Sequence, residues 1–361
     1  MEKIRVCHFT SVHNQLDDRI YLKECCSLAE AEYEVYLVAR GDSQEINNIH
    51  IIGCGEPKNR IDRLLFFSRR VYKAARRLNC AIYHFHDPEL LPYGLKLNRK
   101  GKKVIFDSHE DVPAQILDKN WIPMFCRKVI SFLYTKYETI VVKKIYAVIT
   151  ATDYIKERFY NRAKNVICIR NAPKLDDIYR GKKKYSERND IVCYVGGISG
   201  DRGEEIMREA IKGTNARLII AGDHEKKEEV VKGAEIEYTG KLDRKQVNDL
   251  YSEAKIGLVL LKPLKNYVNS LPIKMFEYMA AGLPVICSNF ETWKEIIESI
   301  NCGICVETDD IDKISEVIKK LLNDKSLAEK MGENGYNYVQ EIFNWKIESV
   351  KLIQLYGAMC E

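Results

Sequence analysis

The sequence lacks any long hydrophobic run. Its longest candidate, Ile256–Leu261, has the length of a buried strand, whereas a bilayer-spanning helix needs roughly 18 or more apolar residues. The N-terminal segment also lacks the form of a signal peptide, because Glu2, Lys3, Arg5 and His8 interrupt its first apolar run. We therefore expect a cytoplasmic protein with no transmembrane helix.

Low-complexity tracts and short-period repeats are absent as well. The 361 residues are 46% hydrophobic and 30% charged, which excludes disordered and collagen-like chains. A chain of this length is too long for one ordinary core and suits two domains of about 150–190 residues each.

Twelve cysteines are present, but their positions do not indicate disulfides. Several lie in or beside short apolar runs, for example Cys7, Cys193 and Cys287, where a free cysteine behaves as a small hydrophobic residue. Cys302 and Cys305 form a lone C-x-x-C pair with no second pair and no nearby histidine. We interpret them as strand-edge thiols in preference to a zinc or redox site.

The net charge of +5 is unevenly distributed. Residues 1–180 hold 31 Lys and Arg against 22 Asp and Glu, whereas residues 181–361 hold 26 against 30. The first half is therefore basic and the second half acidic. This asymmetry predicts that the first half faces something anionic.

Short β-branched runs alternate with longer amphipathic stretches, which is typical of βαβ units with a parallel sheet. The predicted strands are Ile4–Phe9, Tyr33–Ala39, Ala81–Phe85, Lys103–Asp107, Ala147–Ala151, Val166–Arg170, Ile191–Val195, Ala216–Ala221, Ile236–Thr239, Ile256–Leu261, Pro284–Cys287 and Gly303–Val306. The same rhythm restarts at Ile191 after a polar stretch with Pro173 and Gly181. We predict an α/β chain of two Rossmann-like domains facing a cleft: an N-terminal domain over 1–175, a linker over 176–189 and a C-terminal domain over 190–340.

A glycine-rich turn opens the second domain. Gly196–Gly203 follows a predicted strand and precedes a helix, and it contains Arg202. Glycine lets backbone N–H groups approach a ligand closely, and a helix N-terminus attracts an anion. The turn therefore predicts a phosphate site, although many such turns are glycine-rich for steric reasons alone.

The segment Asn269–Ile286 is the most specific in the chain. Pro272 suits a helix start and Gly282 a helix end. Glu277 stands between them among apolar neighbours, where a carboxylate needs a partner. Two ribose hydroxyls would supply one, and an exposed helix glutamate is the alternative.

This segment resembles the donor-binding signature of GT-B glycosyltransferases, specifically glycosyltransferase family 4. The resemblance implies a retaining, metal-independent enzyme that uses a nucleotide-sugar, with Glu277 on the donor ribose and Arg202 on the diphosphate. The implied donor site comprises Gly196, Gly197, Arg202, Lys241, Asn269, Ser270, Ile273, Lys274 and Glu277.

Two positions depart from the family pattern. A second glutamate usually stands where this chain has Asn269, and an arginine usually stands where it has Gly197. Diphosphate neutralisation would then depend more heavily on Arg202. An amide at 269 can donate as well as accept, which favours an N-acetylhexosamine donor over a plain hexose.

The first half carries the same resemblance. Asp107–Glu110 (DSHE) is similar to the strand-end D-x-H-E of capsule and lipopolysaccharide transferases, as are His13–Arg19 and His86–Pro92. The resemblance implies that His109 is catalytic beside the transferred sugar. It also implies that His13, Asp18 and Arg19 lie on the acceptor side.

Three weaker signals remain. Asp310 and Asp312 match the D-x-D of metal-dependent transferases, but an aspartate before an amphipathic helix is typical of an N-cap. The basic residues of the predicted helix Ile61–Leu78 suit either a solvated face or an anionic membrane surface. The aromatic residues of Trp121–Tyr146 add weight to the membrane interpretation. No recognised motif accompanies the charge, so we expect no nucleic-acid partner.

These observations favour a retaining glycosyltransferase of cell-surface polysaccharide synthesis. We expect a UDP-linked sugar donor, a saccharide or lipid-linked acceptor, peripheral association with the inner face of the plasma membrane, and no metal or other cofactor. A non-hydrolysing nucleotide-sugar epimerase of the same fold and a non-catalytic nucleotide-sugar-binding module are the alternatives. The final segment, 341–361, is expected to be a helix that returns to the N-terminal domain.

Overall fold

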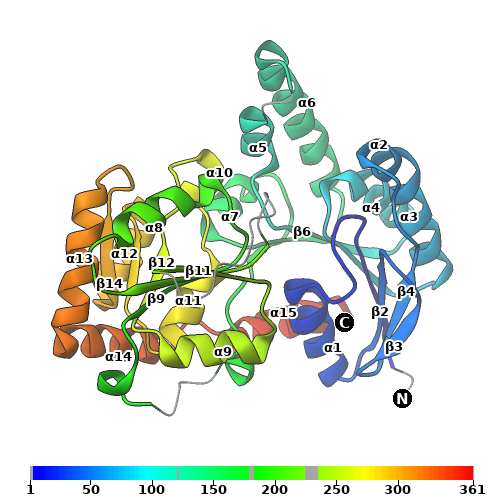
Figure 1. The fold of residues 1–361 in the computed structure, drawn as a ribbon. Helices are drawn as coiled ribbons and strands as arrows, with labels where there is room; N and C mark the ends of the chain where they lie inside the picture. Colours follow the sequence, from blue (N-terminus) through cyan, green and yellow to red (C-terminus); the bar gives the residue numbers. More distant parts are fainter. Residues whose placement is uncertain (1–2, 120–121, 179–182, 224–234, 361) are drawn as a thin grey trace. The chain divides into compact units, whose positions relative to one another are not determined.

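The computed structural model describes residues 3–119, 122–178, 183–223 and 235–360. The chain divides into two compact units, the first formed by 1–171 with 346–361 and the second by 172–345. Each unit is an α/β domain built on its own sheet (Figure 1). The division falls at Asn171, a few residues before the predicted linker of 176–189, and residues 179–182 of that linker lie outside the described residues.

The first unit contains an eight-stranded sheet of order β3-β4-β2-β1-β5-β6-β7-β8. Its pairs are parallel except β3 with β4. The strands are β1 (Arg5–Phe9), β2 (Glu34–Ala39), β3 (Gln44–Ile46), β4 (Ile49–Gly53), β5 (Ile82–Phe85), β6 (Lys103–Ser108), β7 (Ala147–Thr150) and β8 (Val166–Cys168). The helices are η1 (Asp18–Cys25), α1 (Cys26–Glu30), α2 (Arg60–Asp62), η2 (Arg63–Phe67), α3 (Ser68–Arg77), η3 (Pro88–Leu90), α4 (Leu91–Asn98), α5 (Val112–Asp118), α6 (Met124–Val142), α7 (Asp153–Phe159) and α15 (Trp345–Cys360).

Alternation along the strands gives the two faces of this sheet different chemistry. Cys7 and Phe9 of β1 pack with Phe85 of β5 into an apolar cluster under α3 and α4. Because successive side chains point to opposite faces, His8 and His84 lie on the other face. That face is covered by η1 and α15.

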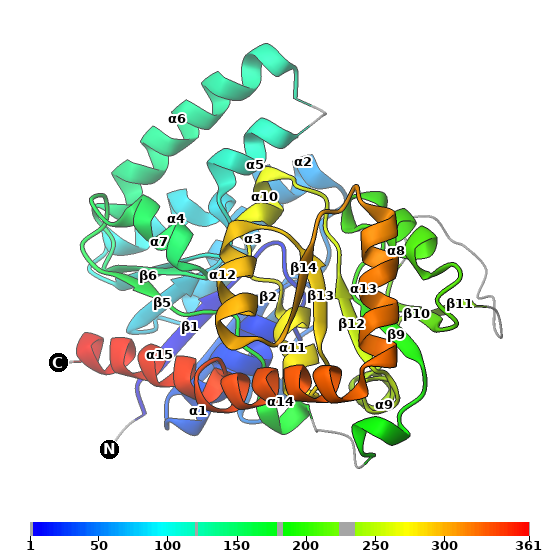
Figure 2. The ribbon, with the colours of Figure 1, turned by 90° about the vertical axis from the view of Figure 1, so that its left-hand side faces the viewer.

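The second unit contains a six-stranded parallel sheet of order β11-β10-β9-β12-β13-β14. Its strands are β9 (Ile191–Val195), β10 (Arg217–Ala221), β11 (Ile236–Gly240), β12 (Ile256–Val259), β13 (Val285–Ser288) and β14 (Gly303–Val306). The helices are η4 (Leu175–Asp177), η5 (Tyr185–Glu187), η6 (Gly200–Arg202), α8 (Glu204–Ile211), α9 (Arg244–Glu253), α10 (Lys265–Val268), α11 (Ile273–Ala280), α12 (Glu291–Ile300), α13 (Ile311–Asn323) and α14 (Lys325–Glu341). Helices α8 and α13 lie side by side on one face (Figure 2), and α9, α11 and α14 pack on the other.

The predicted α/β fold is confirmed, and two local predictions need correction. Strands β3 and β4, at one end of the first sheet, are missing from the prediction. The expected single helix Ile61–Leu78 is three consecutive pieces, α2, η2 and α3, with η2 wound as a π-helix. Segment η1 is also a π-helix.

All twelve cysteines are free thiols, Cys302 and Cys305 included. Within the described residues, no helix combines the length and the apolar character that crossing a bilayer requires. The C-terminal helix begins at Trp345 instead of residue 341, and its residues from Lys346 onward belong to the first unit.

Candidate active site

A cavity of about 560 Å³ opens at the carboxyl ends of β5 and β6 in the first unit. This is the edge where ligands bind in open α/β sheets. Its wall includes His13, Asp87, Glu89, His109 and Glu110. The remaining wall is largely apolar, so the cavity presents a few polar groups on a hydrophobic surface, as small-molecule sites do.

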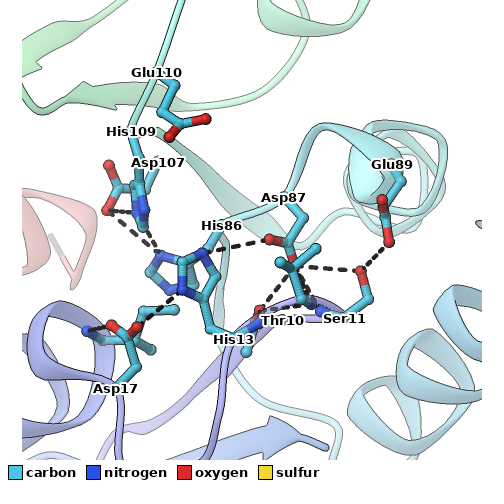
Figure 3. A network of polar contacts seen from close by, with 12 residues as sticks. Thr10, Ser11, His13, Asp17, His86, Asp87, Glu89, Asp107, His109 and Glu110 are labelled. Atoms are coloured by element: carbon cyan, nitrogen blue, oxygen red, sulfur yellow. Dashed lines mark hydrogen bonds and ion pairs between the residues drawn. The ribbon is translucent and has the colours of Figure 1, made fainter. Parts of the chain in front are cut away.

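His109 stands two residues beyond Asp107, at the end of β6. Its Nε2 atom lies 2.9 Å from Asp107 Oδ2 and 3.3 Å from His86 Nδ1. The side chain of His109 is 18% exposed, whereas that of Asp107 is fully buried. The histidine therefore reaches the cavity while a buried carboxylate fixes its ring (Figure 3).

Arg19 keeps that carboxylate ionised. Its Nε and Nη2 atoms donate to both oxygens of Asp107, at 2.9 and 3.1 Å. Burial alone would raise the pKa of Asp107, but Arg19 and His109 hold it well below its usual value. Asp107 is thus a fixed negative charge at neutral pH.

The sequence analysis places Asp18 and Arg19 on the acceptor side, and in the structure both side chains have partners within the first unit. Arg19 is buried and acts through Asp107, and Asp18 pairs with Lys23. Neither residue lines the cavity. The reason is that residues 18–25 form the π-helix η1, which turns the Arg19 side chain toward the sheet.

His13 does line the cavity, held between two carboxylates. Its Nδ1 atom lies 2.9 Å from Asp17 Oδ2, and its Nε2 atom lies 3.7 Å from Asp87 Oδ1. Burial lowers the pKa of His13, but Asp17 and Asp87 outweigh it, so the net shift is upward. Asp87 in turn accepts from Thr10 and from the Ser11 backbone (Figure 3).

In the second unit, the glycine-rich turn folds against the start of α11. Gly196 has φ +138°, and a Cβ built there would lie 2.5 Å from Lys274 Nζ. The lysine ammonium therefore occupies the space that a side chain at 196 would need. It also sits 3.7 Å from the Tyr194 ring centroid, a cation–π contact.

Lys274 is a buried ammonium without a hydrogen-bond acceptor. Its Nζ atom has no hydrogen-bond partner among the described residues. Burial, and secondarily the Arg202 charge, lower its pKa to about 7. An unpaired buried cation is costly, so the residue marks a place for an anion.

Arg202 lies at the same turn. A Cβ on Gly197 would stand 2.9 Å from its Nη1 atom. Burial lowers the pKa of Arg202, but the hydroxyls of Tyr194 and Tyr267 raise it further, so the group stays charged. The missing side chain at 197 makes room for this guanidinium, which explains why glycine suits the position.

Glu277 is buried in α11 at 7% exposure and has two partners from α9. Arg244 Nη1 donates to Oε1 at 2.9 Å, and the Tyr251 hydroxyl donates to Oε2 at 3.1 Å. The alternative of an exposed helix glutamate is therefore wrong. A carboxylate has about four lone-pair sites, so both oxygens can still accept from a ligand.

Arg244 and Tyr251 escape sequence reasoning because no motif links them to Glu277. They stand seven residues apart on α9, two turns of one helix face. That spacing is a weak signal by itself. Only the packing of α9 against α11 brings them to the carboxylate.

The other predicted donor residues lie close in sequence to the glycine-rich turn, to β11 or to α11. Asn269 ends α10, Ile273 begins α11, and Lys241 is exposed in the turn after β11. The Ser270 hydroxyl donates to the Tyr267 carbonyl at 2.8 Å, so it closes a turn. Asp310 caps α13 by accepting from the Lys313 backbone, as predicted for an N-cap.

Two family models match the chain. "Glycosyltransferase Family 4" matches residues 21–172, and "Glycosyl transferases group 1" matches residues 176–338. Together they cover most of both units. The chain belongs to the GT-B glycosyltransferases, family 4-like.

Individual proteins with similar sequences are also named as glycosyltransferases. The uncharacterized glycosyltransferase MJ1069 of Methanocaldococcus jannaschii is 28% identical over 71% of this chain and 68% of its own. The capsular polysaccharide biosynthesis glycosyltransferase CapM of Staphylococcus aureus is 26% identical over 51% and 49%. The chain thus spans about half to two thirds of these relatives' lengths.

Solved structures give the same fold. HepE from Anabaena, in complex with UDP-glucose, has a TM-score of 0.74 over 98% of this glycosyltransferase chain and 100% of its own, at 11% identity. At such low identity the likeness shows the fold alone. The GT-B assignment from the sequence is therefore confirmed by family models and by fold.

Proposed function

We propose that this protein is a retaining transferase that moves a sugar from a UDP-linked donor to a saccharide or lipid-linked acceptor. The role we assign is cell-surface polysaccharide synthesis, which is the role that the name of CapM states for that protein. A UDP-sugar is supported by the family signature around Glu277. It is also the ligand of the structurally similar HepE.

The observation that carries this proposal is the unpaired ammonium of Lys274 at the glycine-rich turn. A donor diphosphate would give it an acceptor and would meet Arg202 at the same turn. Both cations, with the N-terminus of α8, can stabilise the charge that develops on the leaving nucleotide. We therefore propose that no metal ion is needed at the diphosphate.

The chemistry that follows is assisted by His109. We propose that it acts beside the transferred sugar and that the donor phosphate assists deprotonation of the acceptor hydroxyl, on the same face as the leaving group. Asp107 holds the His109 ring in place and stabilises it when charged. Asn269 is proposed to favour an N-acetylhexosamine donor.

The cavity of the first unit favours transfer over epimerisation. It offers about 560 Å³ beside His109, which an epimerase acting on the donor alone would not need. Leu64, Tyr134 and Tyr137 form part of its wall. These residues come from η2 and α6, two elements that expose several large apolar side chains.

That apolar surface supports a lipid-linked acceptor. Helix α6 packs on α5 and α4, and within the described residues of the first unit no other element covers much of its length (Figure 2). We name the α6 face by its exposed apolar residues. They are Met124, Phe125, Val129, Ile130, Phe132, Leu133, Tyr137 and Ile140.

Two exposed lysines lie along the α6 face. Met124 and Phe125 are 80% and 81% exposed, Lys128 follows them by one turn, and Lys136 lies over the Phe132 ring. An apolar helix face edged by basic residues is typical of a helix that lies in a membrane interface. Because Tyr137 belongs both to this face and to the cavity wall, we propose an anionic bilayer as the occupant of the face. Trp121, which the sequence analysis included in the membrane prediction, lies outside the described residues.

A panel of nucleotide-sugars tests the donor assignment, followed by an acceptor assay. A donor at 100 times its Kd raises the free energy of unfolding by about 2.7 kcal/mol, which a thermal-shift assay detects. Transfer from the best UDP-sugar to membrane extracts should then need no added magnesium or manganese, and Arg202→Ala should abolish it. Release of an epimerised free donor without acceptor would support the epimerase instead.

A further inference from the structure

Three imidazoles gather on the buried face of the first sheet. His8 of β1 pairs in register with His84 of β5, and His86 follows two residues later on the same face. All three side chains are fully buried. Nothing in the proposed transfer requires histidine at positions 8 and 84, because neither lines the cavity.

Glu24 of η1 points into this group. Neither of its oxygens has a hydrogen-bond partner of good geometry, and the side chain has no exposed surface. Its Oε2 atom lies 3.7 Å from His8 Nδ1, 3.9 Å from His86 Nε2 and 4.0 Å from His84 Nδ1. The Oε2 atom therefore lies among imidazole nitrogens with lone pairs that no hydrogen bond within the described residues uses.

The spacing of these atoms matches a metal site. His8 Nδ1 and His86 Nε2 are 3.1 Å apart. A point equidistant from three atoms separated by 3.1, 3.7 and 3.9 Å lies about 2.1 Å from each. Zinc binds imidazole nitrogen at about 2.0–2.1 Å and carboxylate oxygen at about 2.0–2.2 Å. We infer that His8, His86 and Glu24 bind one divalent transition-metal ion of the zinc class, with His84 beside its fourth position.

The surrounding groups are placed as outer partners of such ligands. The second nitrogen of His8 lies 3.0 Å from the Tyr356 hydroxyl, and that of His86 lies 3.4 Å from Asp107 Oδ2. The other oxygen of Glu24 lies 3.1 Å from Arg19 Nε. Metal-bound histidines donate their second N–H to such acceptors, which fixes the ring and its tautomer.

The π-helix η1 is a further observation in favour of a metal site here. Residues 18–25 form η1, and π-helical turns are rare and are frequent at functional sites. The wider turn lets Arg19 and Glu24 face the sheet together. A regular helix would rotate one of these side chains away.

This site is distinct from the proposed diphosphate site, which lies in the other unit. The inference goes beyond the proposed function and also beyond the sequence analysis, which considered metal only at the D-x-D pair and at the Cys302–Cys305 pair. The ion would be structural. It would hold His86 in the tautomer that donates to Asp107, and Asp107 holds His109.

Metal content and cobalt spectroscopy test the inference. The full chain is stripped with a chelator under mild denaturant, refolded with ZnCl₂ or CoCl₂, and desalted. We expect about one ion per chain by inductively coupled plasma mass spectrometry. Cobalt should give the visible absorption of a nitrogen- and oxygen-ligated ion, without the thiolate charge-transfer band that the twelve cysteines would produce.

Two variants sharpen the result. Glu24→Gln keeps the shape of the side chain but removes the charged ligand, so the zinc affinity should fall at least about tenfold. His50→Ala removes a partly exposed histidine of β4, remote from this group, and should bind zinc like the unchanged protein. Zinc should also raise the thermal midpoint of the unchanged protein and of His50→Ala, but not of Glu24→Gln.

Three results would contradict the proposed metal site. Refolded protein that holds less than about a tenth of an equivalent of zinc and of cobalt would overturn the inference. So would a cobalt spectrum dominated by thiolate charge transfer, or a Glu24→Gln protein that binds zinc like the unchanged chain. If Glu24→Gln fails to fold, the stoichiometry and the cobalt spectrum of the unchanged chain still decide.

Discussion

At the scale of single residues, the carboxylate of Glu277 has two partners already in place. Arg244 and Tyr251 orient it before any ligand arrives, so little rotamer freedom is lost on binding. A hydrogen bond to a charged group is worth roughly 1.5–3 kcal/mol. Glu277→Ala should weaken UDP binding at least about tenfold in isothermal titration calorimetry. Glu291→Ala, an exposed glutamate at the start of α12, is the control, and unchanged UDP affinity in a folded Glu277→Ala protein would contradict the ribose assignment.

If Lys274 meets the donor diphosphate, as we propose, donor binding should depend on pH. Its pKa in the folded protein is about 7, against 10.5 for a free lysine, so the free site loses its charge as the pH rises above 7. A bound diphosphate favours the ammonium and raises this pKa. Binding therefore takes up a proton, and affinity should fall roughly tenfold between pH 7 and pH 8.5. Calorimetry with a nucleotide-sugar checks this, since its diesterified diphosphate does not titrate in that range.

The matched control for this pH effect is Lys274→Met. It keeps the length of the side chain and removes the titrating group. Its affinity should be low and nearly independent of pH over the same interval. A pH-independent affinity in the unchanged protein, or the same slope in Lys274→Met, would show that the lysine does not meet the diphosphate.

His109 is expected to affect turnover and not donor binding. It is partly exposed to the cavity and is held by Asp107. His109→Ala should lower kcat by roughly a hundredfold or more, as for loss of a positioned acid or base, with nearly normal UDP affinity. Initial-rate kinetics and calorimetry separate the two quantities. A large loss of stability with high residual activity would instead identify a structural histidine.

At the scale of elements, the α6 face and the basic helix α3 are expected to contribute differently to the proposed membrane binding. The exposed apolar side chains of α6 would insert, whereas Arg69, Arg70, Arg76 and Arg77 of α3 contribute about 1 kcal/mol each near anionic lipid. Replacing Phe125, Phe132 and Leu133 with serine should abolish co-sedimentation with anionic vesicles at every salt concentration. Neutralising the four arginines should only weaken binding, mostly at low salt.

Neutral vesicles provide the control for this prediction. Binding of the unchanged protein should need anionic lipid and should decline as the salt concentration rises. Equal binding to neutral and anionic vesicles would remove the role of α3. Full binding by the triple serine variant would show that the α6 face does not contact lipid.

The elements differ in how readily the sequence predicts them. Strands β9 and β14 match their predicted bounds because β-branched residues and glycine mark both ends. Strand β3 escapes prediction because it has three residues, is mostly polar and lies at the sheet edge. Strand β4 is apolar but short, with His50 interrupting its isoleucines and Gly53 at its end. The π-helical turns η1 and η2 have no sequence signature, so the burial of Arg19 and Glu24 could not be foreseen.

The candidate site divides in the same way. Motifs of contiguous residues predict Glu277, Arg202 and His109, because each has its chemistry within a few residues of a strand or helix end. Partners that come from separate elements, such as Arg244 for Glu277 or His8 for His86, depend on packing. Such partners come together only when the strands and helices pack, so no fixed spacing between them along the sequence can predict the contact.

At the scale of the whole molecule, the two ends of the chain meet in the core of the first unit. The Tyr356 hydroxyl of α15 lies 3.0 Å from both His8 Nε2 and His84 Nδ1, and all three side chains are fully buried. Tyr356→Phe would leave two imidazole nitrogens without this partner, at a cost of about 1–3 kcal/mol. Tyr160→Phe changes an exposed tyrosine and serves as the control.

Because the chain forms two units, the loss of stability in Tyr356→Phe should affect the thermal unfolding of one of them. A nucleotide-sugar that binds the second unit raises the melting temperature of that unit, whereas Tyr356 belongs to the first. In differential scanning calorimetry, Tyr356→Phe should therefore lower the transition that does not respond to nucleotide-sugar, by about 2–4 °C per kcal/mol. A lowered nucleotide-responsive transition, or no change in either one, would mean that α15 does not stabilise the first unit through this hydroxyl.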